Sequence, residues 1–114
     1  MKKDQDANWI LTVNCKPSEH PWVEGTLEKI EPDQSHTENS YRFQAKVYDE
    51  GSKFGIDNGC ISKLAVWKNR PGHINFSRDV IANYDRGWDI QPTDAAEKEV
   101  LRTIISGLEE TPKQ

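Results

Sequence analysis

The chain has 114 residues, of which 34% are hydrophobic and 30% charged, and its formal net charge is −4 at pH 7. This length predicts a single domain over 1–114, ordered from about residue 8 to residue 109 and frayed at 1–7 and 110–114. The acidic balance argues against a general nucleic-acid binder, whose affinity comes mainly from Lys and Arg clusters. Two cysteines, no signal-peptide core and no apolar run of membrane length favour a reduced, cytoplasmic protein without a membrane partner.

Period-two alternation of apolar and polar residues predicts strands at residues 8–16, 22–30 and 41–48. The third has the clearest pattern and is expected to have one buried and one wet face. The residues expected on the buried sides of the first and third strands are Trp9, Leu11, Val13, Cys15, Tyr41, Phe43, Ala45 and Val47.

The middle of the chain predicts further strands separated by loops. Residues 31–40 are polar and are expected to form a mobile loop, and Asp57-Asn58-Gly59 marks a turn. Residues 61–68 are apolar on both parities, as in a central strand. A short fifth strand is expected around Ile74 and Phe76, and a sixth from Val80 to Tyr84. Six strands in sequence favour an antiparallel meander.

The last segment changes to helical periodicity. Pro92 and Thr93 or Asp94 supply the start of a helix, and Asp94 with Glu97 three residues later resembles a capping box. The helix is expected to run to about Leu108. The fold class expected is therefore α+β, an antiparallel meander of five or six strands packed on one face by a C-terminal α-helix. The apolar stripe of this helix is predicted to hold Ala96, Val100, Leu101, Ile104, Ile105 and Leu108. The solvent-facing side of the helix is predicted to hold Lys98, Arg102, Ser106 and Glu109.

Four distinctive strings lie within residues 41–89, a stretch of about half the chain: residues 41–52, 55–57, 61–64 and 84–89, the last reading Tyr-Asp-Arg-Gly-Trp-Asp. In these strings the chain resembles a family of short uncharacterised proteins from phages and other mobile elements of Gram-positive bacteria. The resemblance implies a setting among accessory or host-interaction genes. It brings no activity, ligand or catalytic residue.

Motifs for cofactors and metals are weak in this sequence. The three histidines are scattered, and the two cysteines are far apart, so no zinc spacing is present. The glycine-containing loop at 51–59 has neither the P-loop nor the dinucleotide order, and it lacks the ligand order of a calcium loop. We therefore predict no cofactor, no metal and no catalytic residue. Cys15 is expected to be inert in the core, and Cys60 to be an unremarkable small residue.

The segment from Tyr84 to Asp89 concentrates charge and aromatic rings just ahead of the helix. Arg86 is expected to tie Asp85 or Asp89 in a structural pair. An acid and base pair at this corner, serving a small hydrolase or ligand-binding pocket, is the rival interpretation. The candidate binding residues in this corner are Tyr84, Asp85, Arg86 and Trp88.

The wet face of the sheet provides the second group of candidates. If Tyr41 and the alternate residues of its strand (Phe43, Ala45 and Val47) face the helix, the other side of the sheet carries basic and aromatic side chains from two neighbouring strands. This mixture suits protein docking or the stacking of single-stranded bases, and it is equally typical of a merely solvated face. The candidates are Arg42, Lys46, Tyr48, Lys63 and Trp67.

The function expected is that of a small non-catalytic accessory protein that binds another protein of unknown identity. A modulator of a host or defence factor fits the mobile-element resemblance. A nucleic-acid-binding accessory factor is the first alternative, and the acidic total makes it the weaker one.

Overall fold

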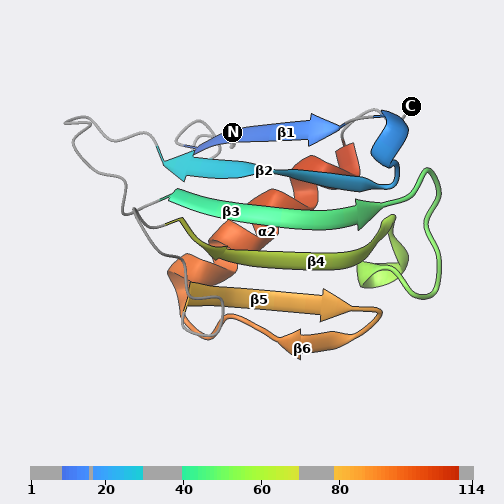
Figure 1. Ribbon diagram of the computed structural model, residues 1–114. Coiled ribbons are helices and arrows are strands. Elements are labelled where there is room, and N and C mark those ends of the chain that lie inside the picture. Colours follow the sequence, from blue (N-terminus) through green and yellow to red (C-terminus); the bar gives the residue numbers. More distant parts are fainter. Residues whose placement is uncertain (1–8, 16, 30–39, 70–78, 111–114) are drawn as a thin grey trace, which may run out of the picture.

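The computed structural model describes residues 9–15, 17–29, 40–69 and 79–110. Six strands form one sheet in the order β1-β2-β3-β4-β5-β6, and each pairs antiparallel with the next. The predicted meander and α+β class are thus confirmed (Figure 1). The strands are β1 (Trp9–Cys15), β2 (Trp22–Lys29), β3 (Ser40–Val47), β4 (Ile61–Lys68), β5 (Val80–Asp85) and β6 (Trp88–Ile90).

Five of the predicted strands occur within one or two residues of their expected ends. β6 was not predicted, and the expected strand around Ile74 and Phe76 lies outside the described residues, as does most of the predicted loop 31–40. Ser40 was assigned to that loop, but it opens β3 and is buried. Short 3₁₀ turns, η2 (Pro17–Glu19) and η3 (Ile56–Asn58), lie between strands.

The C-terminal helix α2 (Ala95–Glu110) lies across one face of the sheet, behind the strands in Figure 1. It begins where the sequence predicts, because Asp94 Oδ1 accepts the Glu97 N–H at 2.7 Å. None of the described helices is long and apolar enough to cross a membrane.

The core lies between α2 and the inner face of the sheet. Phe43, Leu64 and Ile104 are among the side chains with almost no exposed surface. Two expectations for this layer were wrong: Cys15 is exposed at the end of the edge strand, and Ala96 is exposed in the first turn of α2. The buried hydrophobic residues are Leu27, Tyr41, Phe43, Ala45, Val47, Ile56, Ile61, Leu64, Val66, Ile81, Ala82, Tyr84, Val100, Leu101, Ile104 and Leu108.

The end of α2 is fastened to the start of β4. Both carboxylate oxygens of Glu109 lie within hydrogen-bond distance of the Cys60 N–H, at 3.2 and 2.9 Å. Gly59 permits this approach, since a Cβ there would lie 2.2 Å from Glu109 Oε2. Glu109 was expected on the wet side of the helix, and this contact corrects that expectation. A charged acceptor on a backbone amide anchors the last helical turn to the sheet.

Candidate functional site on the outer face of the sheet

The face of the sheet opposite α2, here called the outer face, carries the alternate side chains of β1 to β5. The antiparallel register arranges them in four rows across the strands. The rows are Ile10-Glu28-Ser40, Thr12-Thr26-Arg42-Trp67, Asn14-Glu24-Gln44-Ala65-Asn83 and Trp22-Lys46-Lys63-Asp85.

Two cations of β3 stack on aromatic rings of the neighbouring strands. The Arg42 guanidinium carbon lies 5.9 Å from the centre of the Trp67 ring, and Lys46 Nζ lies 5.1 Å from that of Trp22. Each pair consists of direct cross-strand neighbours, so the ladder fixes the two partners side by side. Such contacts contribute about 0.5–1 kcal/mol each at exposed positions. They hold the cations against the sheet and leave them accessible.

Lys63 extends the basic row but is neutralised by its neighbour on β5. Its Nζ lies 3.3 Å from Asp85 Oδ1, and the two side chains are 38% and 58% exposed. An ion pair of this kind adds little stability, since solvent screens it. Lys63 is therefore a weaker candidate for contact with an acidic partner than Arg42 or Lys46.

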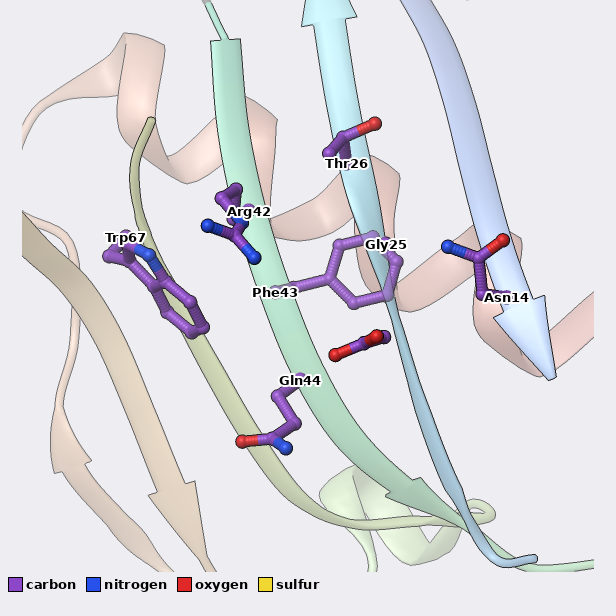
Figure 2. Close-up of a pocket in the computed structure, with 8 residues that line it drawn as sticks. Asn14, Gly25, Thr26, Arg42, Phe43, Gln44 and Trp67 are labelled. Carbon is purple, nitrogen blue, oxygen red and sulfur yellow. The ribbon is translucent and has the colours of Figure 1, made fainter. Parts of the chain in front are cut away.

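A shallow hollow of about 250 Å³ opens between the rows, as Figure 2 shows. Arg42 and Trp67 project side by side along one flank, and Asn14 comes from β1 on the other. The sequence predicted Arg42 and Trp67 here but missed most of the rest. The signal that was missed is the alternation in β2, which puts Glu24 and Thr26 on one side of the strand. The sequence did not show that this side belongs to the same face of the sheet as Arg42. The lining residues are Asn14, Glu24, Gly25, Thr26, Arg42, Phe43, Gln44 and Trp67.

The outer face carries charges of both signs, with the basic strands in the centre. The basic side chains lie on β3 and β4, while Glu24 lies on β2 and Asp85 on β5. Glu24 lines the same hollow as Arg42. A run of nucleic-acid phosphates crossing the hollow would meet this carboxylate, whereas a protein surface with both signs of charge would match the pattern.

Tyr48 lies just past the end of β3 and is 41% exposed. Its N–H donates to the Cys60 carbonyl at 2.9 Å, so its backbone is fixed while its ring stays accessible. Tyr48 thus adds an accessible aromatic ring next to the Lys46 end of β3.

The corner predicted as a second site is held together by contacts of its own. Tyr84 is buried, and its hydroxyl donates to the Phe54 carbonyl at 2.9 Å. The Trp88 ring meets the Tyr84 ring edge-on at 5.0 Å between centres. These contacts tie the loop between β3 and β4 to the hairpin between β5 and β6.

The expected pairing of Arg86 with Asp85 or Asp89 was wrong. Arg86 has a left-handed backbone (φ 61°), and its guanidinium carbon lies 5.6 Å from the centre of the Phe54 ring. Asp85 keeps its place on the outer face and pairs with Lys63. Asp89 lies 3.4 Å from the Asn83 amide nitrogen.

No group of three or more His, Cys, Asp or Glu side chains converges on a possible metal position within the described segments. His20 and Asp49 form a pair at 3.3 Å, and both side chains are well exposed. The outer face thus combines cations, amides and aromatic rings, and Arg42, Trp67, Asn14 and Gln44 are among the residues that line its hollow.

Comparison with known proteins gives a family without an assigned role. No curated protein and no solved structure matches the chain significantly. A family model covers residues 21–109, from the start of β2 almost to the end of α2, and leaves β1 outside. Because this match spans most of the chain, the protein belongs to the family described as a domain of unknown function (DUF7678).

Proposed function

We propose that this protein is a small, non-catalytic accessory protein that binds another protein through the outer face of its sheet. The observation that carries the proposal is the pair of cation and aromatic stacks on this face. Arg42 on Trp67 lines the hollow, and Lys46 on Trp22 lies two rows further along the strands. Tryptophan, tyrosine and arginine are the side chains most enriched among the strongest contributors to protein interfaces.

The exposure of these groups supports binding rather than packing within the chain. Trp22 is 38% exposed, and Arg42 is exposed as well. An exposed tryptophan on a rigid strand loses little conformational freedom when a partner covers it, so its burial translates efficiently into affinity.

The setting that fits this proposal is cytoplasmic, as a modulator of a host or defence factor encoded on a phage or other mobile element. The sequence resemblance described above supports that setting. A protein whose partner belongs to its host needs an accessible docking surface and no catalytic machinery.

Binding of single-stranded nucleic acid is the alternative favoured by one observation, the pairing of basic and aromatic side chains on adjacent strands. Glu24 in the same hollow and the net charge of −4 weigh against it. Nucleic-acid binding would fall steeply with added salt, because phosphate contacts release counterions. A ligand pocket at the Tyr84 corner is the weaker alternative, since that tyrosine's hydroxyl is engaged by Phe54.

The test is a titration of the partner captured from the native host. The variant Trp22→Ala, Arg42→Ala, Lys46→Ala removes both stacks, and we expect it to fold and to bind at least about thirtyfold more weakly, since one interface anchor contributes about 2 kcal/mol. The matched control, Lys98→Ala, Arg102→Ala, Ser106→Ala, alters exposed residues of α2 and should bind normally. Equal affinities for a folded outer-face variant and the wild type would refute the proposal.

A further inference from the structure

The second accessible feature of the sheet is its β1 edge, which is distinct from the outer face. β1 is terminal in the strand order and pairs with β2 over all seven residues without a register shift. Half of the backbone N–H and C=O groups of such a strand point away from its single neighbour. The opposite edge, β6, has three residues and includes a carboxylate, Asp89.

β1 lacks the usual protection of an edge strand. Its sequence, Trp-Ile-Leu-Thr-Val-Asn-Cys, contains no charge, no proline and no glycine. Natural edge strands avoid pairing with other chains by carrying lysine, proline or a bulge, or by being short. β1 has none of these features, so a further strand can be added to it in register.

The strand is held rigidly enough to act as a template. Trp9 Nε1 lies 3.3 Å from Glu99 Oε2 on α2, and Leu11 reaches α2 at Gly107, where a Cβ would lie 2.2 Å from Leu11 Cδ2. Trp9, Leu11 and Val13 pack against the core but are only partly buried. A strand added beside β1 would cover more of these three side chains.

We propose that two copies of the chain associate through antiparallel pairing of their β1 strands about a two-fold axis at Thr12. In this register the inner side chains of one copy lie beside the inner side chains of the other, and all seven residues are paired. A two-fold axis at Leu11 or Val13 would also keep the faces together but would pair only five residues. The pairs between the two copies are Trp9 with Cys15, Ile10 with Asn14, Leu11 with Val13, and Thr12 with Thr12.

A second copy fits this edge because the strand is complementary to itself. None of the four kinds of pair places like charges opposite each other, and Leu11 beside Val13 continues the apolar layer. At the axis, Thr26, Thr12 and their counterparts form a ladder of four threonines, since Thr12 is paired with Thr26 within each chain. Cross-strand threonine pairs are favourable. The proposal is independent of the partner-binding role of the outer face.

The size of the contact predicts a reversible dimer. Seven paired residues give about six to eight backbone hydrogen bonds and a small buried area, which is typical of weak association. We expect the mass measured by sedimentation or light scattering to rise from one chain towards two across a micromolar to millimolar series.

Thr12→Lys tests the axis directly, because it places two ammonium groups opposite each other in the dimer and leaves an exposed lysine in the monomer. We expect this variant to remain one chain at every concentration. Its matched control, Thr93→Lys, makes the same change at an exposed position ahead of α2, outside β1 and the hollow, and should dimerise like the wild type.

A cross-link tests the register without disturbing the fold. In a Cys15→Ser background, Thr12→Cys should give a covalent dimer on mild oxidation, since directly opposed residues have Cα atoms about 4.5–5.5 Å apart. Asn14→Cys should not, because two such residues would lie four positions, or about 13 Å, apart. A wild-type chain that stays monomeric throughout, including one whose β1 takes a strand from another protein instead, would overturn the proposal. So would a dimer that persists in Thr12→Lys or fails to cross-link through Thr12→Cys.

Discussion

Gly25 in β2 occupies a position where a side chain would not fit. A Cβ at this position would lie 1.9 Å from the Thr12 carbonyl oxygen and 2.8 Å from the tip of the Phe43 ring. Phe43 is its direct cross-strand partner, so the ring covers the glycine from β3, an arrangement that stabilises glycines in strands. The sheet is thus closely packed beneath the hollow of the outer face.

Gly25→Ala should therefore destabilise the protein by about 1–3 kcal/mol, the usual cost of forcing an extra methyl group into a packed site. Gly87→Ala is the matched control, because a Cβ there meets nothing within 4 Å. Chemical denaturation of both variants measures the difference. Equal stabilities of Gly25→Ala and Gly87→Ala would show that β1 and β3 can shift to make room for a methyl group at residue 25.

Tyr41 carries a pKa shift with a clear physical origin. Burial raises the pKa of its hydroxyl above the ordinary value of 10.0, and the negative charges of Glu97 and Asp94 raise it further. The folded state therefore holds the proton more tightly than the unfolded state. The contribution to stability is complete below pH about 10 and is lost as the pH rises from there through the folded pKa.

Glu97→Gln should lower the Tyr41 pKa in part, because burial, the larger cause, remains. Titration of the tyrosinate absorbance, with Tyr41→Phe as the reference for the other tyrosines, measures this shift. A Tyr41 pKa that does not change in Glu97→Gln would show that the Glu97 charge does not reach the hydroxyl.

Arg86 illustrates what the sequence could not predict at this scale. Its neighbours Asp85 and Asp89 made a local ion pair the natural expectation, but the left-handed backbone of the turn directs its side chain to Phe54 instead. Asp85 finds Lys63 through the register between β4 and β5. The register joins residues about twenty positions apart, so the local sequence around Arg86 does not show that Asp85 already has a partner.

At the scale of elements, α2 is the cover of the core. Ile104 is fully buried, whereas Lys98 is exposed. Ile104→Ala should lower the free energy of unfolding by about 2–5 kcal/mol, the range for removing a buried aliphatic side chain, and Lys98→Ala should change it by no more than about 0.5 kcal/mol. Small and equal losses in thermal or urea unfolding would contradict the docking of the helix.

The strands and the helix were largely predictable because each buries one face. Alternation in β3 identified Tyr41 and Phe43 as inner residues, and the helical stripe identified Ile104 and Leu108. Short or terminal segments carry less of this signal. β6 has three residues, too few for a period, and Cys15 ends an edge strand where alternation no longer guarantees burial.

At the scale of the whole molecule, the meander determines which side chains can act together. Consecutive pairing places β3 and β4 at the centre of the sheet, so Arg42 and Lys46 gather beside Trp67 and Trp22. The parity of β3 and β4 was predictable from the sequence. The addition of β2 to the same surface was not, because it depends on strand pairing across the segment between residues 29 and 40.

The most direct test of the central claim is a map of backbone amide signals by NMR during titration with the partner captured from the native host. We predict the largest changes at the outer-face positions of β2, β3 and β4, centred on Arg42, Gln44 and Trp67, with the exposed side of α2 unchanged. Changes concentrated on Lys98 and Arg102, or in the loop between β3 and β4, with the outer face unaffected, would contradict the account.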